Sequence, residues 1–306
     1  MILYLYGDNS YAINRQLAAI KGKYLDKTGQ DGDFSSYDLK NADINGLLAD
    51  LRALPMFSTS RLVFAENAVG SKLSVEQIDG LISDLPESTN LVFVDYTPDK
   101  RTSIFKKLAG LKGAKRFDRL PADKLPQWVV AEAKKAGAKI DYGVARYLVE
   151  HVGADQWLLY NEIQKLSQAG AEITKQTIQS LSSPSFESTA FQLAEALIKR
   201  DLKKSLEIYD GLKLQGSADQ MIQGAIIYQY RTILLATLDD SELLAAYKLG
   251  SYPIQKARAL SRGVGLDQIK SAYHKIAQAD LAVKTGELPA TEAMQGLIYE
   301  IGRAHV

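Results

Sequence analysis

Cysteine is absent from this 306-residue chain, and histidine occurs only three times. The lack of cysteine excludes disulfide bonds, thiol nucleophiles and cysteine-ligated zinc. His151, His274 and His305 lie far apart in the sequence and lack the spacing of metal ligands. We therefore interpret them as surface or helix-packing histidines, and expect neither a metal site nor a cofactor.

Long hydrophobic runs and an excess of one charge are also missing. The longest apolar runs are strand-sized, such as "LVFV" at 91–94, far short of the ~18 residues of a membrane span. The first residues, "MILYLYGDN", have no basic segment and no small-residue cleavage site, so we interpret them as a strand and expect a cytoplasmic protein. The formal net charge of +1 excludes a global electrostatic surface for nucleic acid.

Strand and helix signals alternate up to residue 136, which predicts an α/β domain with a mostly parallel sheet. Short apolar runs predict strands at 2–6, 34–39, 61–67, 90–96 and 115–120. Between them, apolar residues at helical spacing predict helices at 10–25, 44–54 and 74–85. Ser74 and Gln77 have the spacing of a capping box at the start of the last of these.

After "GAKID" (137–141) the strand signals stop and the pattern predicts helices alone. Three short helices, closed by the linker "SSPSF" (182–186), indicate a helical module. Longer helices are predicted at 188–199, 202–214, 218–238, 241–249, 253–262, 266–285 and 290–302. In the 266–285 helix, Asp280 and Lys284 have the spacing of a structural ion pair.

The loop after the first strand has the position of a phosphate-binding loop but not its chemistry. Such a loop needs G-x-x-x-x-G-K-[ST], because backbone N–H groups and a lysine hold the phosphates. Here it is "GDNSYAIN" (7–14): Gly7 is present, but Ala12, Ile13 and Asn14 stand where the second glycine, lysine and hydroxyl belong. We expect a degenerate loop that does not bind ATP.

One local run is strongly basic. The stretch "KKLAGLKGAKRFDR" (106–119) holds six basic residues with one acid between them. It is either a solvated face of the α/β domain or a DNA-facing patch. The basic residues are Lys106, Lys107, Lys112, Lys115, Arg116 and Arg119.

The stretch "LRALPMFSTSRLVFAEN" (51–67) places large apolar residues between a predicted helix and a predicted strand. Connections usually carry polar turn-formers. Met56 and Phe57 either fold back into the protein's own core or project into a partner's pocket, where Pro55 would lower the ordering cost. The residues alone leave both interpretations open.

Several segments, in their order and spacing, resemble the delta subunit of the bacterial DNA polymerase III clamp loader. They are "LYGDNSYAINRQL" (5–17), "LPMFSTSRLVFAEN" (54–67), "WVVAEAKKAGAKIDYGVARYLVEHVGADQWLLYNEIQKL" (128–166), "FQLAEALIKRDLKKSLEIYDGLKLQG" (191–216) and "ADLAVKTGE" (279–287). The resemblance implies an AAA+-like α/β domain at 1–136, a three-helix lid domain at 137–186 and a helical collar domain at 187–306.

The same resemblance implies a function without catalysis. Members of the family grip the β sliding clamp and open the ring for loading onto primed DNA, while the collar joins the ATPase (gamma/tau) and delta prime subunits. The gripping wedge falls on Met56 and Phe57, supported by Leu54 and Pro55. The usual wedge is Leu-Phe, so Met56 is a departure that bears on the tightness of the grip.

Two rival hypotheses remain beside this one. The first is a divergent P-loop ATPase acting on DNA, which nucleotide binding by the isolated chain would support. The second is a direct DNA-binding protein that uses the 106–119 run, which steep salt dependence of binding would support.

Overall fold

The structure, a computed structural model, describes residues 1–29, 32–41, 44–53, 55, 58–247, 249 and 251–303; of residues 44, 45, 251 and 252 it describes only the backbone. The chain forms two compact units, Met1–Leu120 and Pro121–Val306.

A five-stranded parallel sheet organises the first unit. Its strands, in chain order, are β1 (Ile2–Gly7), β2 (Asp33–Asp38), β3 (Arg61–Glu66), β4 (Thr89–Tyr96) and β5 (Ala114–Phe117). Their order in the sheet is β2-β3-β4-β1-β5, and each pair of neighbours is parallel. The central strands are apolar on both faces because helices cover both.

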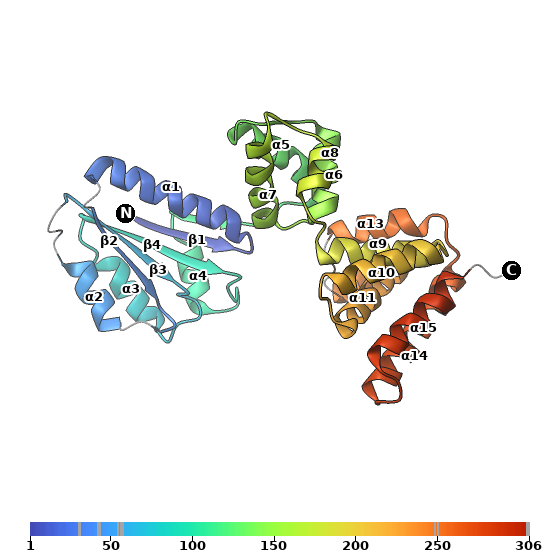
Figure 1. Ribbon diagram of the computed structural model, residues 1–306. Coiled ribbons are helices and arrows are strands. Elements are labelled where there is room, and N and C mark those ends of the chain that lie inside the picture. The colour runs from blue at the N-terminus through green and yellow to red at the C-terminus, as the bar shows by residue number, and fades with distance from the viewer. Residues whose placement is uncertain are drawn as a thin grey trace. The chain divides into compact units, whose positions relative to one another are not determined.

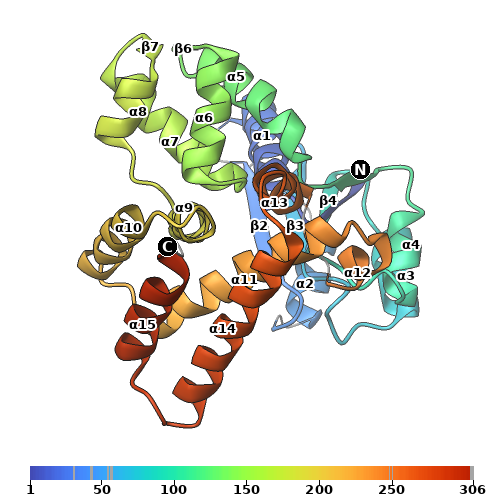
Figure 2. The same ribbon diagram turned by 90° about the vertical axis from the view of Figure 1, so that its right-hand side faces the viewer.

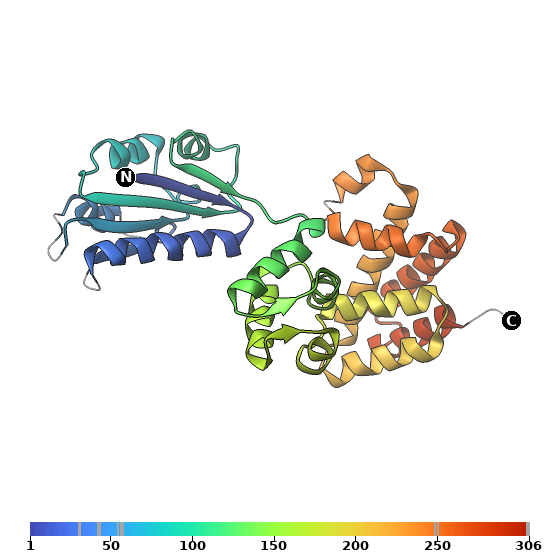
Figure 3. The ribbon, with the colours of Figure 1, turned by 90° about the horizontal axis from the view of Figure 1, so that it is seen from above.

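One helix covers one face of this sheet and three helices cover the other (Figures 1 and 3). α1 (Ser10–Thr28) packs Ile13 and Leu17 against Leu5 and Val92. The opposite face is closed by α2 (Ile44–Arg52), α3 (Val75–Ser83) and α4 (Ser103–Ala109). The capping box of Ser74 and Gln77 is confirmed at the start of α3, whereas α4 was not expected within the basic run.

The second unit begins with a group of short helices (green, Figure 2). A 3-10 turn, η1 (Ala122–Lys124), leads into α5 (Leu125–Lys135), which packs on α6 (Tyr142–Val152) and α7 (Gln156–Ala169). α8 (Lys175–Leu181) completes the group. α5 therefore belongs to the second unit, although its residues fall inside the predicted 1–136 domain.

A small parallel sheet lies within this group, where the sequence predicted helices alone. β6 (Lys139–Ile140) pairs with β7 (Glu172–Ile173) in a register that matches Ile140 with Ile173. Both isoleucines are buried. The expectation that strands end before 142 is thus wrong for β7.

The rest of the second unit is helical, as predicted. Its helices are α9 (Phe186–Ile198), α10 (Leu202–Leu214), α11 (Asp219–Leu238), α12 (Ser241–Ala246), α13 (Ser251–Ser261), α14 (Leu266–Lys284) and α15 (Ala290–Gly302). A single core runs through α9, α10, α11, α14 and α15, with Tyr230 and Met294 fully buried in it. The predicted fold class, a parallel α/β domain followed by an all-helical part, is confirmed.

Candidate functional site: the α2–β3 connection

The connection between α2 and β3 carries the residues that the sequence analysis singled out. α2 ends at Arg52, and β3 begins at Arg61. Of the predicted wedge, Pro55 is described and is half-buried, whereas Leu54, Met56 and Phe57 lie outside the described residues. The wedge remains a prediction, whereas both ends of the connection lie among the described residues.

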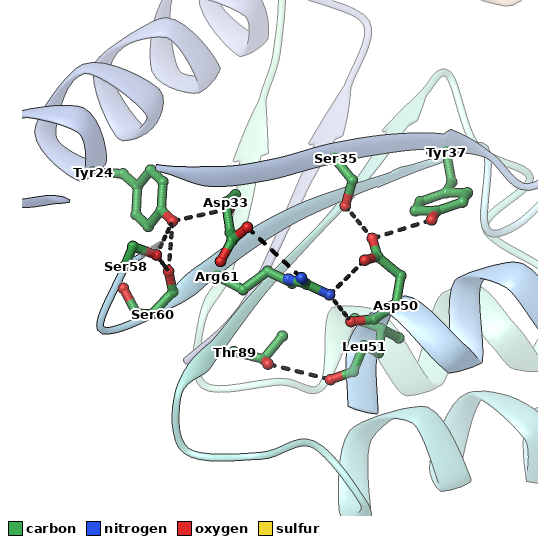
Figure 4. Close-up of polar contacts among 10 residues, drawn as sticks. All are labelled: Tyr24, Asp33, Ser35, Tyr37, Asp50, Leu51, Ser58, Ser60, Arg61 and Thr89. Carbon is green, nitrogen blue, oxygen red and sulfur yellow. Dashed lines mark hydrogen bonds and ion pairs between the residues drawn. The ribbon is translucent and has the colours of Figure 1, made fainter. Parts of the chain in front are cut away.

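Arg61 binds the last turn of α2 (Figure 4). Its guanidinium group lies 2.5 Å from a carboxylate oxygen of Asp50 and 2.6 Å from the carbonyl oxygen of the same residue. A carboxylate oxygen of Asp33, at the start of β2, lies 3.8 Å away. Arg61 is only 9% exposed, so these charge-assisted contacts lie in a poorly solvated place.

Asp50 is held from a second side by β2. Its other carboxylate oxygen accepts hydrogen bonds from the hydroxyl groups of Ser35 and Tyr37, the latter at 3.1 Å. Ser35 and Tyr37 alternate along the strand and so point to the same face of the sheet. The carboxylate of Asp50 therefore links α2 to both β2 and β3.

Thr89 holds the next carbonyl of α2. Its buried hydroxyl group, at the start of β4, donates a 3.2 Å hydrogen bond to the carbonyl oxygen of Leu51. The last carbonyls of a helix have no partner within the helix. Arg61 and Thr89 supply partners for two of them, just before the connection leaves α2.

Tyr24 binds the other end of the connection. Its hydroxyl group lies 2.6 Å from the carbonyl oxygen of Ser60 and 2.9 Å from that of Asp33. The hydroxyl group of Ser58 also donates to the Ser60 carbonyl, at 2.5 Å. Tyr24 comes from α1, so the segment that precedes β3 is tied to the opposite layer of the domain (Figure 4).

This polar network was not predicted. The sequence gives one indication of it: an acid, Asp50, precedes the connection and a base, Arg61, follows it. Opposite charges at that separation are common in any chain. The pairing of β2 with β3 places Arg61 opposite Asp33, and the last turn of α2 brings Asp50 to the same guanidinium group.

The loop at 7–14, predicted to be a degenerate phosphate loop, is bound by contacts from the β5 side. The amide of Asn9 donates to the Asp118 carbonyl oxygen at 3.0 Å, and the carboxylate of Asp8 accepts from the backbone of Arg119 at 2.8 Å. A Cβ atom on Gly7 would lie 1.9 Å from the carbonyl oxygen of Phe117. Gly7 thus has a packing reason to be glycine.

The residues in the Gly-Lys-Ser/Thr positions serve α1 itself. The backbone of Ala12 donates to the capping side chain of Asn9 at 3.0 Å, and Ile13 is fully buried in the core under α1. Asn14 accepts a hydrogen bond from the hydroxyl group of Tyr96 at 3.1 Å.

The six basic residues of the 106–119 run do not form one face. Lys107 forms an ion pair with Asp79 of α3 at 2.6 Å, and Arg116 with Asp118 at 2.7 Å. Lys115 and Arg116 are consecutive in β5, so they point to opposite faces of the sheet. Lys106, Lys112 and Arg119 are exposed. Acidic neighbours therefore offset part of the charge of this run.

His151 and the Asp280–Lys284 pair make contacts that stabilise the fold. His151 lies 2.9 Å from the Ser182 carbonyl oxygen and stacks on Tyr147, as expected of a helix-packing histidine. Asp280 and Lys284 form the predicted ion pair, at 2.6 Å. In the described parts of the chain, no three acidic or histidine side chains are grouped so as to hold a metal ion. No helix there is long and apolar enough to span a membrane.

Two family models match the chain. Residues 3–115 match "DNA polymerase III, delta subunit", and residues 187–301 match "DNA polymerase III delta subunit, C-terminal domain". The first range includes the whole α2–β3 connection. The chain belongs to the DNA polymerase III delta subunit family.

Relatives of this family resemble the chain over nearly its whole length. DNA polymerase III subunit delta of Bacillus subtilis is 25% identical over 92% of this chain and 87% of its own. A solved structure, the DNA clamp loader delta protein of Bacillus subtilis, has a TM-score of 0.69. It is 21% identical and covers 98% of this chain and 95% of its own, so it supports the fold.

Membership of this family assigns the chain to DNA replication, as a subunit of DNA polymerase III. The resemblance stated from the sequence is confirmed by these matches. Residues 116–186, which include the whole of the predicted lid domain (137–186), lie outside both matched ranges.

Proposed function

We propose that this delta-family chain is a clamp-loader subunit that binds the β sliding clamp through Leu54, Pro55, Met56 and Phe57. By inserting Met56 and Phe57 into a pocket of the clamp, it destabilises one interface of the closed ring, which opens for loading onto primed DNA. The chain contributes binding energy and no bond-making chemistry.

The observation that carries this proposal is the set of contacts that bind the two ends of the α2–β3 connection. Both of its ends are bound to the domain, at Asp50 and Leu51 on one side and at Ser60 on the other. Two large apolar residues and a proline stand between these ends. Each large side chain gains about 1.5–3 kcal/mol on burial in a partner, which is the scale of an interface hot spot.

The contacts and residues of the loop at 7–14 support a subunit that does not use ATP itself. Asp8 and Asn9 are bound to the β5 side, and no lysine occurs before Lys21 to hold a phosphate. The energy for cycling would come from ATP on neighbouring subunits. Nucleotide titration of the isolated chain tests this: we expect no binding, and a micromolar dissociation constant for ATP would favour the rival P-loop ATPase.

We further propose that the helices from 187 to 306 form a collar that joins the ATPase (gamma/tau) and delta prime subunits, and that 137–186 is a lid. Large apolar side chains lie exposed on the helices after residue 187, with Leu214 of α10 at 89% and Leu281 of α14 at 63% exposure, and we propose that they contribute to these contacts. The complex would act in the cytoplasm, where the chromosome is replicated.

The basic run at 106–119 is proposed to face DNA only within the assembled loader. Ion pairs with Asp79 and Asp118 offset part of the charge of this run, which lowers the number of phosphate contacts that one chain can make. We expect weak DNA binding by the isolated protein; tight, steeply salt-dependent binding would instead favour a direct DNA-binding function.

Replacing Met56 and Phe57 by alanine tests the clamp proposal. We expect the double variant to lose clamp binding while it keeps its melting temperature and its assembly with the other subunits. Leu158→Ala/Leu181→Ala, which removes exposed apolar side chains from the second unit, is a matched control and should bind the clamp normally. Undiminished clamp affinity of the Met56/Phe57 variant would reject the proposal.

A further inference from the structure

We propose that a small cavity in the second unit, lined by Arg200, Tyr230 and Lys275, binds a carboxylate group. The cavity measures about 60 Å³ and lies among α9, α11, α14 and α15, which pack on one another (Figure 2). A single water needs roughly 10–15 Å³, whereas the pocket of a drug-sized ligand starts at about 300 Å³. The cavity therefore fits a group of a few atoms, and a nucleotide is too large for it.

The lining of this cavity runs from the surface of the unit to its core. Ser271 and Glu300 are exposed, whereas Tyr230 is 0% exposed. The hydroxyl group of Tyr230 has no hydrogen-bond partner among the described residues. Burial raises the pKa of Tyr230, so the hydroxyl group keeps its proton and is available as a donor. A buried donor without a partner costs free energy, and an acceptor that enters the cavity removes this cost.

Arg200 occupies a backbone position that favours glycine. It directly follows Lys199, the C-cap of α9, and its φ is +57°. Its backbone N–H donates to the Leu197 carbonyl oxygen, and that of Asp201 donates to the Ala196 carbonyl oxygen, which is the Schellman ending of a helix. Glycine adopts this conformation without the steric cost that a Cβ atom brings. The backbone alone therefore gives no reason for an arginine here.

The side chain of Arg200 supplies that reason. It is half-buried, lines the cavity and forms no ion pair with an acid of the described residues. Lys275 lies 3.9 Å from a carboxylate oxygen of Glu300, whose side chain is 63% exposed. Of the described residues that line the cavity, two are thus bases and one is an acid. A carboxylate supplies the missing negative charge, and its two oxygens match the parallel N–H groups of a guanidinium.

Two sources present this chemistry. One is a free small carboxylate, and the other is an aspartate or glutamate side chain of a neighbouring subunit. The second source rests on the proposed function, in which these helices join other subunits of the clamp loader. The first is independent of it.

Melting temperatures of the full-length chain in sodium acetate and in sodium chloride, at equal ionic strength, test the chemistry. We expect about 100 mM acetate to raise the melting temperature by about 2 °C or more relative to chloride. Arg200→Gly suits the backbone, and Tyr230→Phe deletes a hydroxyl group without a partner among the described residues. Neither should lower the melting temperature in chloride, and both should lose most of the acetate response.

Arg262→Gly is the matched control. It removes the same charge from an exposed residue that does not line the cavity, and it should keep the acetate response. A wild-type chain without the response, or a response that survives in Arg200→Gly and Tyr230→Phe, would overturn the proposal: the cavity then holds water only. A variant that melts well below the wild type in chloride would show a purely structural role for its side chain and would also count against it.

Assembly with the other clamp-loader subunits distinguishes the two sources. If an acidic side chain of a neighbour enters the cavity, Arg200→Gly should weaken assembly about tenfold or more, while Arg262→Gly should not. Normal assembly of Arg200→Gly, with an acetate response that depends on Arg200, indicates a free carboxylate. If the wild type does not assemble with those subunits, the proposed function is wrong, and the acetate measurement on the isolated chain still decides whether the cavity binds a carboxylate.

Discussion

The hydroxyl group of Tyr209 donates a 2.6 Å hydrogen bond to the carboxylate of Asp219, at the point where α10 meets α11. The same carboxylate accepts from Lys213 at 2.8 Å and from Thr291 of α15 at 2.6 Å. Asp219 is buried, so one acid joins three helices of the second unit. Burial opposes its ionisation, but the hydrogen bonds from Lys213, Thr291 and Tyr209 outweigh it and lower its pKa.

Replacing Asp219 by asparagine should therefore destabilise the second unit. We expect a loss of about 2 kcal/mol at pH 7, because charge-assisted bonds are replaced by weaker ones in a buried place. A lowered folded-state pKa stabilises the protein above the unfolded value and less as the pH falls through the folded one. The gap between the variant and the wild type should be constant from pH 5 to 8 and shrink below about pH 4.

Urea unfolding at several pH values measures this gap. Asp280→Asn removes the exposed helical pair with Lys284 and is the control, expected to change stability by less than about 0.5 kcal/mol. An Asp219 variant as stable as the control at pH 7 would contradict the prediction.

For Asp95 we expect stability to depend on pH with the opposite sign. It lies buried at the end of β4, and this burial raises its pKa to about 6 although the backbone of Val69 donates to it. The folded protein therefore holds a proton that the unfolded chain loses near pH 4, so stability falls as the pH rises from about 4 to about 6. Above that range the cost is constant, at about 3 kcal/mol.

Asp95→Asn should remove this slope and stabilise the first unit at pH 8 by about 2 kcal/mol, because the amide stays neutral. Chemical unfolding between pH 4 and 8 measures both effects. Asp84→Asn, in an exposed pair with Arg52, should leave the slope in place. An Asp95 variant that keeps the slope would show that another group causes it.

Replacement by alanine should have opposite effects on stability at Gly7 and at Gly22. At Gly7, φ is +143° and a Cβ atom would meet the Phe117 backbone, so Gly7→Ala should cost about 3 kcal/mol or more. At Gly22, inside α1, a Cβ atom meets nothing within 4 Å, so Gly22→Ala should stabilise by about 0.5–1 kcal/mol. Melting temperatures of the two variants decide; a neutral Gly7→Ala would contradict the close approach of β1 and β5.

Met56→Leu tests the proposed wedge at the position where it departs from the usual Leu-Phe pair. The two side chains have similar volume, but leucine loses less rotamer freedom on binding. We expect the clamp to bind this variant about two- to fivefold more tightly, by surface plasmon resonance, with an unchanged melting temperature. Weaker binding would mean that the pocket requires the flexibility of methionine.

The periodic elements were predictable from the sequence, since long apolar stripes such as that of α14 leave few alternatives. β6 and β7 were not, because two residues cannot show a period. α4 was not predicted because Lys106 and Lys107 were interpreted as part of a basic run, and the N-cap at Thr102 was overlooked.

For the candidate site, the sequence indicated the connection but not the residues that bind its two ends. Met56 and Phe57 are conspicuous because apolar residues are rare in turns. The bonds from Tyr24, Arg61 and Thr89 depend on the order of strands in the sheet, which brings together residues that are far apart in the chain.

Gly7 also bears on the loop at 7–14, which has the position of a phosphate-binding loop but not its residues. A glycine there looks like the last remnant of a phosphate loop, but the carbonyl of Phe117 occupies the space that its missing side chain leaves. The close contact between β1 and β5 therefore requires glycine at this position whether or not the loop binds a phosphate. A lysine introduced into this loop would leave this close contact between β1 and β5 unchanged.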